Sequence, residues 1–342
     1  MKKIFVDKEH WEEFNEYGKF LPGKAIEPDR QLYDNNGIIP NPAFPFLSAY
    51  LKEREFKPFW PDGYKFAVCL THDIDNLKPP RLGRVPVPYY LRKPLITCSK
   101  KFKAAWDLEK IIDLETEYNA KSSFFFLALE YGDESFNYRI DELKIEIDHI
   151  KRRGWDIGLH GGHNASIDAG SLKREKKRLL SIVDNKIAGY RGHYLKLRKP
   201  TTWKMLVNEE FEYDTTFGYP NRVGFRNGLC YPFRPFDALK NEYIDIIEIP
   251  LALMDATLFS SMNLNINESW IEAKKVIDNA IECEGVVTIL WHNTNAWDKN
   301  LTFYRKILLY VNKAGGWLTS GAEINAWWKK HNDYLICYDE ID

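Results

Sequence analysis

Cysteine is scarce in this chain of 342 residues, and long apolar runs are lacking. The five cysteines lie far apart and form no CxxC pair, which argues against a disulfide framework and predicts buried free thiols in a reducing compartment. No segment is apolar over the length needed to cross a bilayer. The first residues also lack the apolar core of a secretory signal. We therefore expect a soluble, cytoplasmic protein without a transmembrane segment.

Net charge is also nearly absent. The formal net charge of −1 excludes a globally basic nucleic-acid-binding protein, so no nucleic acid is expected as a partner. What the chain does contain is a regular alternation between apolar runs of strand length and amphipathic helical segments, from about residue 64 to residue 330. This alternation predicts an α/β fold with a parallel sheet of roughly seven strands, either open or closed into a barrel.

Three segments stand outside that alternation. Residues 1–62 are rich in proline and are expected to form an extension that packs on the main domain of residues 63–342, with helices over 7–17 and 46–53. Residues 76–106 form a long insertion with eight lysines and arginines and no acidic residue. Residues 217–238 form a second irregular insertion, which contains Arg226.

Ionisable side chains collect where the predicted strands end. The strand over 66–70 is followed by two aspartates, the strand over 155–159 by two histidines, and later strands by an arginine, an aspartate and a histidine: Asp73, Asp75, His160, His163, Arg191, Asp214 and His292. In a parallel barrel these strand ends share one face. One aspartate with two histidines suits a first-row metal ion, while another carboxylate and a separate histidine suit a general base and a general acid. The pattern predicts a metal-assisted hydrolase.

Four short motifs carry a resemblance to a known family. They are THDID at 71–75, GLHGGH at 158–163, RGHY at 191–194 and LWH at 290–292. In this order they resemble the successive motifs of the polysaccharide deacetylase superfamily, the NodB-homology domain of carbohydrate esterase family 4, over about residues 64–330. Longer phrases resemble a bacterial branch found with surface-polysaccharide enzymes. The resemblance implies a distorted (β/α)7-type barrel, here with an N-terminal wrapping segment and two long loop insertions.

The resemblance also implies a role for each matched residue. Asp73 matches the catalytic base and Arg191 the residue that orients it, while Asp75 and His160 match metal ligands. Tyr194 stands where the family places a backbone N–H that holds the oxyanion, and His292 matches the general acid. The implied cofactor is a divalent metal, with Zn²⁺ the commonest choice and other first-row ions fitting the same ligands.

Two departures from the family pattern leave alternatives open. His160 and His163 are three residues apart where the family has four, and Asn164 occupies the usual place. Either His163 binds from a shifted glycine-rich loop, or Asn164 is a weak ligand, or metal binding is lost. We take His163 as the third ligand. Either Asp214 or Asp255 can pair with His292, and we count Asp214 among the catalytic residues. Three more residues are expected to line the substrate pocket: His193, Arg226 and Trp291.

The expected function is that of a metal-dependent hydrolase that removes the N-acetyl group from an N-acetylated sugar in surface polysaccharide biosynthesis and releases acetate. The alternative is a catalytically degraded carbohydrate-binding or scaffold protein on the same fold, and a further one is hydrolysis of a formamide or a non-sugar amide. A cluster of like charges repels itself unless an anion offsets it, so the basic insertion suggests a sugar carried on a diphosphate. A solvated loop paired with acids elsewhere explains the same charges.

Overall fold

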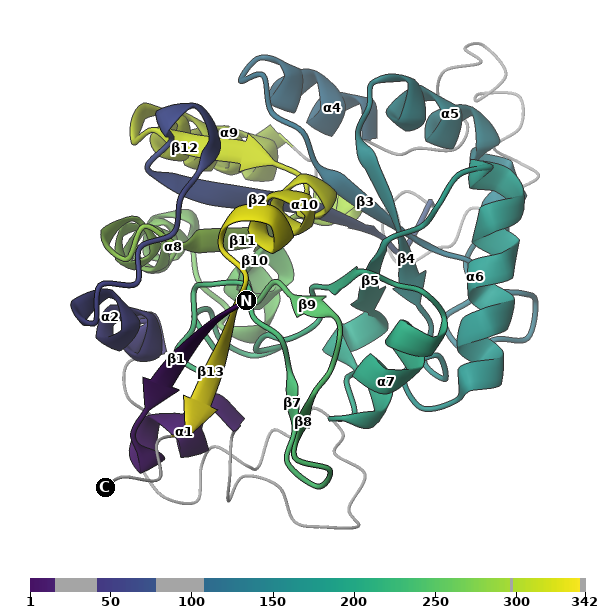
Figure 1. Cartoon of the computed structure of the whole chain (residues 1–342). Coiled ribbons are helices and arrows are strands. Elements are labelled where there is room, and N and C mark those ends of the chain that lie inside the picture. The colour runs from purple at the N-terminus through teal and green to yellow at the C-terminus, as the bar shows by residue number, and fades with distance from the viewer. Residues whose placement is uncertain (16–41, 78–107, 296–297, 339–342) are drawn as a thin grey trace.

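A parallel sheet forms the centre of the molecule (Figure 1). The computed structural model describes residues 1–15, 42–77, 108–295 and 298–338. Within these residues the order of the hydrogen-bonded strands is β10 (Leu251–Met254), β11 (Val286–Leu290), β2 (Phe66–Ile74), β3 (Ser123–Leu127), β4 (Asp156–Gly161), β5 (Gly189–Gly192), β6 (Tyr213–Asp214) and β9 (Ile247–Glu248). Strand β12 (Gly316–Thr319) pairs with the first half of β2, and β3 pairs with the second half.

The sheet curls back on itself. Its two ends in the strand order are β9 and β10, which only two residues of chain separate. A linker that short spans at most about 10 Å, roughly two strand spacings, so the two ends of the sheet lie near each other. The distorted barrel of parallel strands is thereby confirmed.

The strands are buried on both faces, as their sequences predict. All nine residues of β2 and all five of β3 are buried, including the consecutive aromatics of the segment SFFFL. Continuous apolar runs of this kind are typical of parallel strands with helices packed against them. Polar residues in such strands therefore need a reason to be there, and those at the carboxyl ends of β2, β4 and β5 form the candidate site.

Helices surround the sheet in Figure 1. They are α4 (Leu108–Thr116), α5 (Lys144–Arg152), α6 (Ala169–Val183), α7 (Thr201–Asn208), α8 (Ile266–Glu282), α9 (Asp298–Lys313) and α10 (Gly321–His331). Capping side chains mark where two of them begin: Asp168 accepts a hydrogen bond from the Ser171 N–H, and Asn265 with Glu268 forms a capping box. None of the helices in the described ranges is long and apolar enough to span a membrane.

The N-terminal segment contacts the rest of the chain at several points. Strand β1 (Lys2–Val6) pairs in parallel with β13 (Tyr334–Tyr338), and α1 (Lys8–Asn15) follows it. Helix α2 (Phe46–Glu53) buries two leucines, and its Ser48 hydroxyl accepts a hydrogen bond from the Cys230 N–H. These contacts agree with an extension packed on the main domain, while the boundary after residue 62 stays a prediction.

The two predicted insertions differ in what the structure describes. Residues 78–107, which hold the cations of the basic insertion, lie outside the described residues. The second insertion is described, and its irregular chain ends in a hairpin of β7 (Phe236–Asp237) and β8 (Glu242–Tyr243). Four of the five cysteines fall within the described ranges, and all four are free thiols.

Candidate active site

Strands β2 and β4 bring the first three predicted residues together. Asp73 lies near the end of β2, Asp75 follows that strand, and His160 lies in β4. Nε2 of His160 is 3.1 Å from Oδ1 of Asp75 and 3.6 Å from Oδ2 of Asp73. Nδ1 of His160 is 3.0 Å from the carbonyl oxygen of Arg191, to which it can only donate, so Nε2 is the nitrogen left for a ligand. Burial opposes a charge on His160, but Asp73 and Asp75 raise its pKa.

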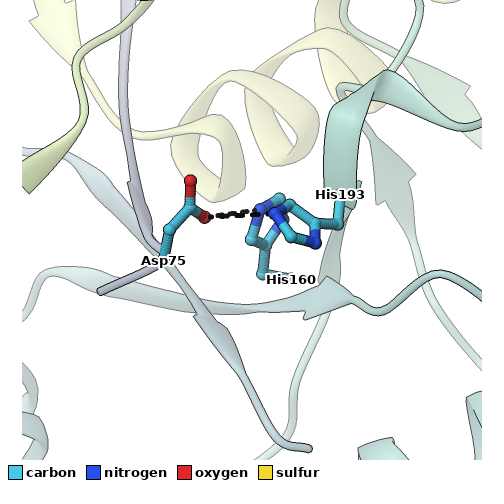
Figure 2. A group of neighbouring side chains, drawn as sticks. All are labelled: Asp75, His160 and His193. Atoms are coloured by element: carbon cyan, nitrogen blue, oxygen red, sulfur yellow. Dashed lines mark ion pairs between the residues drawn. The ribbon is translucent and has the colours of Figure 1, made fainter. Parts of the chain in front are cut away.

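His193 joins this group from a short 3₁₀ turn, η4 (His193–Leu195), which directly follows β5. Its Nε2 lies 3.8 Å from Oδ1 of Asp75, and its ring centroid lies 4.9 Å from that of His160 (Figure 2). Tyr194 and Leu195 have φ values of 56° and 54°, in the left-handed region that few side chains adopt. This sharp turn leaves His193 buried and Tyr194 exposed, with the Tyr194 ring stacked on the His193 ring.

Asp75, His160 and His193 fit a divalent metal ion. Each offers one ligand atom, and the three atoms lie within 4.8 Å of one another. Oδ1 of Asp75 is buried and has no hydrogen-bond partner within the described residues, and the His193 nitrogen that faces it is Nε2. Burial lowers the pKa of His193 to about 3, and the neighbouring His160 contributes a smaller part of this shift. The His193 imidazole is therefore neutral and can bind a cation.

His163 does not belong to that group, so the choice of His163 as third ligand is corrected to His193. Nδ1 of His163 lies 2.6 Å from the Lys196 ammonium and 3.3 Å from a Glu134 carboxylate oxygen. The glycine turn before it explains the position, because the Gly162 N–H donates to Glu175 at 2.7 Å and directs the chain away from Asp75. Asn164, the alternative ligand, is exposed.

Asp73 and Arg191 form a buried pair beside the group. Nη1 of Arg191 is 3.9 Å from Oδ2 of Asp73, while Nη2 donates to the hydroxyl of Thr71 at 3.1 Å and to that of Thr215. Oδ1 of Asp73 and Nε of Arg191 have no hydrogen-bond partner in the part of the chain that the structure describes. An ionised carboxylate with an open acceptor position is what a general base requires.

On the other side of Asp75 lies His292, which follows β11. Its Nδ1 is 2.6 Å from Oδ1 of Asp255, its N–H donates to Oδ2 of Asp255 at 2.8 Å, and its Nε2 is 3.7 Å from Oδ2 of Asp75. Burial opposes the charge on His292, but Asp255, then Asp75 and Asp73, raise its pKa to about 10. This histidine is therefore protonated at neutral pH and has a proton to donate from Nε2.

Asp255, not Asp214, is the partner of His292, and this corrects the placement of Asp214 among the catalytic residues. Asp214 is buried beside Glu248, and the Trp203 indole N–H lies 3.0 Å from an oxygen of each. Burial raises the pKa of both carboxyls. Asp214 also accepts the N–H of Thr216 at 3.0 Å, so it supports the turn after β6.

The predicted substrate-pocket residues lie in three different surroundings. His193 is a candidate metal ligand, as described above. The Arg226 guanidinium lies over the Phe217 ring, 4.6 Å from its centroid. Trp291 is 1% exposed and stacks on Tyr304 with ring centroids 4.8 Å apart, so it packs in the core and cannot line an open pocket. Its placement among the substrate residues is corrected accordingly.

Comparison of the sequence with protein-family models finds no match, and neither does comparison with curated proteins. Among solved structures, the fold is similar to one named "putative polysaccharide deacetylase from Mycobacterium smegmatis", with a TM-score of 0.57 and 18% identity over 83% of this chain and 98% of that one. Two others align with TM-scores of 0.41: a mutant of the peptidoglycan deacetylase PdaC from Bacillus subtilis (12% identity, 80% and 95% covered) and a CE4 family pseudoenzyme from Bacillus anthracis (9% identity, 81% and 70% covered). The chain thus has the fold of polysaccharide deacetylases, as its motifs imply.

Proposed function

We propose that this chain is a metal-dependent hydrolase that removes the N-acetyl group from an N-acetylated sugar in surface polysaccharide biosynthesis. One observation supports this most strongly: a three-residue metal set, Asp75, His160 and His193, has a carboxylate and a protonated histidine beside it. Asp73 is the carboxylate and His292 the histidine. Amide hydrolysis needs a group of each kind, because one proton must leave the water and another must reach the amine.

A divalent ion such as Zn²⁺, held by the three ligands, would supply Lewis acidity that polarises a carbonyl and brings the pKa of water from about 15.7 toward about 7. The chain's own residues do the rest. Asp73, beside Arg191, takes a proton from the water that adds to the acetamide carbon. The backbone N–H of Tyr194 would donate to the oxyanion that forms, which is the role that the family resemblance implies. His292 then gives its Nε2 proton to the nitrogen as the C–N bond breaks, and the products are acetate and an amino sugar.

The proposal about the carrier of the sugar is based on the charge of one insertion. Residues 76–106 contain eight cations and no acid, and the chain enters this insertion directly after Asp75. We propose that these cations bind a phosphate-bearing carrier, a nucleotide diphosphate or a polyprenyl diphosphate. Charge reversal at Arg81, Arg84, Arg92 and Lys93 should raise KM for such a substrate, and the wild-type advantage should shrink with added salt. An equal response of a neutral oligosaccharide would contradict the carrier proposal.

The direct test of the activity is acetate release. Protein stripped of metal by a chelator should release no acetate from N-acetylated nucleotide sugars, lipid-linked sugars or oligosaccharides, and reloading with Zn²⁺ should restore release from one of these classes. A matched control is Asp73→Asn, which should bind metal normally and release acetate about 10²–10⁴-fold more slowly. Metal-loaded wild-type protein that is inactive on all three classes would overturn the proposal.

The alternative, a carbohydrate-binding or scaffold protein, rests on the spacing of His160 and His163. Since His193 can take the third position, that basis is weakened. The two functions still separate in one experiment, because a scaffold with a degraded site would hold no stoichiometric divalent metal even after reconstitution.

A further inference from the structure

A buried polar network lies on the outer face of β2, behind the site. Helices α4 and α9 pack beside each other (Figure 1). His72, which follows Thr71 and precedes Asp73 in that strand, contacts a side chain of each helix. Its Nε2 is 2.9 Å from Oε1 of Glu115 on α4. The Glu115 carboxylate also accepts the hydroxyls of Ser122 and Tyr304, and all four side chains are fully buried.

The other nitrogen of His72 reaches the segment that leads to His292. Nδ1 of His72 is 2.9 Å from the carbonyl oxygen of Trp291. A carbonyl has no proton to give, so Nδ1 must carry the proton and donate. Strand β11 ends at Leu290, and the Trp291 N–H still donates to the Thr71 carbonyl at 2.9 Å. The His72 side chain thus satisfies the Trp291 carbonyl at the point where the strand ladder stops.

Trp291 is consequently held at three points. Its N–H bonds to Thr71, its C=O accepts from His72, and its ring stacks on Tyr304, which itself donates to Glu115. The next residue in the chain is His292. Fixing the peptide before His292 restricts the direction in which its imidazole can point, since a side chain placed by packing and hydrogen bonds holds its neighbours in one geometry.

We propose that His72 is a positioning residue for His292: its Nδ1–H clamps the Trp291 carbonyl, and Glu115 orients the imidazole that does so. This inference rests on the proposed function, in which His292 protonates the departing amine. His72 and Glu115 touch neither the candidate metal ligands nor the reacting atoms. Their loss should therefore affect proton delivery and leave metal binding intact.

Two substitutions at one position separate the clamp from simple burial. In His72→Asn the amide nitrogen takes the place of Nδ1, so the bond to Trp291 is retained and that to Glu115 is lost. In His72→Gln the amide nitrogen takes the place of Nε2, so the bond to Glu115 is retained and that to Trp291 is lost. The clamp predicts that His72→Gln lowers kcat/KM for an acetamide roughly tenfold or more relative to an activated aryl acetate, whose leaving group needs no proton. His72→Asn should keep the wild-type ratio.

Hydrogen exchange supplies a readout that does not depend on activity. Protection of the backbone N–H groups of residues 291–295 should fall in His72→Gln and persist in His72→Asn. In wild-type protein, nitrogen-15 NMR should show a proton on Nδ1 of His72, a test that remains even if a variant fails to fold. Equal exchange and equal substrate ratios in the two variants, or a bare Nδ1, would overturn the clamp. A clamp seen by exchange in a protein inactive on every substrate would instead contradict the proposed function.

Discussion

His193 and His292 face the same carboxylate, Asp75, from two sides, and their surroundings give them opposite charges. Burial, and to a smaller extent the neighbouring His160, lowers the pKa of His193 to about 3. On the His292 side, burial is outweighed by Asp255 and two further aspartates, and the pKa rises to about 10. One residue type thus supplies a neutral candidate metal ligand on one side of Asp75 and a proton donor on the other.

This difference indicates that a second carboxylate, that of Asp255, makes His292 a proton donor and not a metal ligand. Asp255 accepts from the backbone N–H of His292 and contacts Nδ1 of its ring. His193 has no such partner on Nδ1 within the described residues. Changes that alter this asymmetry should change what each histidine does, and they are ordered below by the size of the expected effect.

The largest effect should come from removing one of the candidate metal ligands Asp75 and His160. Asp75→Ala and His160→Ala should each eliminate stoichiometric metal binding and all detectable turnover. Asp73→Asn should keep the metal and lose about 10²–10⁴-fold in kcat, the contribution of a general base. Metal analysis beside single-turnover kinetics checks both. Metal loss in Asp73→Asn with metal retention in Asp75→Ala would reverse the two assigned roles.

Removing His193 should disable the metal side alone. His193→Ala should weaken metal affinity by more than about 100-fold, since losing even a supporting group of a ligand costs 10–100-fold. The matched control is His163→Ala, which should bind metal with wild-type affinity because His163 bonds to Lys196 and Glu134 instead. Competition with a chromogenic chelator measures both affinities. A defect in His163→Ala equal to that in His193→Ala would restore His163 as a ligand.

Neutralising Asp255 should make the pKa of His292 more like the low pKa of His193. In Asp255→Asn the pKa of His292 should fall, so that turnover of an acetamide declines at a lower alkaline pH than in wild type and by roughly tenfold to a hundredfold near pH 8. Hydrolysis of an activated aryl acetate should change little. Asp214→Asn is the control, since Asp214 supports Thr216 and does not touch His292. If Asp214→Asn lost acetamide turnover and kept aryl acetate turnover as Asp255→Asn does, the pairing of Asp255 with His292 would be contradicted.

The last prediction concerns stability and not turnover: on the metal side, burial also disfavours a charge on Glu175. Burial raises the pKa of Glu175, which accepts the Gly162 N–H, from 4.5 to about 7. An acid with a raised folded-state pKa stabilises the fold below its unfolded pKa and loses that contribution as pH rises through the folded pKa. The free energy of unfolding of the wild-type protein should therefore fall by on the order of 3 kcal/mol between pH 4.5 and 7. That of Glu175→Gln should not show this fall. Urea unfolding at both pH values tests this, and parallel curves for the two proteins would contradict it.

Strand ends were the most predictable feature of the site. Asp73, Asp75, His160 and His292 could be selected from the sequence because an apolar run of strand length precedes each of them, and parallel strands bring their carboxyl ends together. The sequence placed His193 at the substrate pocket but did not indicate it as a candidate metal ligand. Its position depends on two consecutive residues with left-handed φ values, which the letters Tyr and Leu do not indicate.

Asp255 shows a different limit. The run Leu251–Met254 forms β10, and Asp255 follows it with the same pattern of an apolar strand ending in a carboxylate. The run is only four residues long, too short for periodicity alone to mark it as a strand, so the sequence leaves both Asp214 and Asp255 open as the partner of His292. Within the fold, the alternating strands and helices followed from periodicity. The parallel pairing of β1 with β13 did not, because segments 330 residues apart leave no local signal.

One spectrum tests the division between the histidines most directly. Metal-free protein labelled with nitrogen-15 at histidine would be titrated with Zn²⁺ at pH 7 and followed by NMR of the imidazole nitrogens. The account predicts that the signals of His160 and His193 shift to metal-bound values at one equivalent, that His163 stays unchanged, and that His292 keeps protons on both nitrogens. Zinc binding by His163 in place of His193, or by His292, would contradict it.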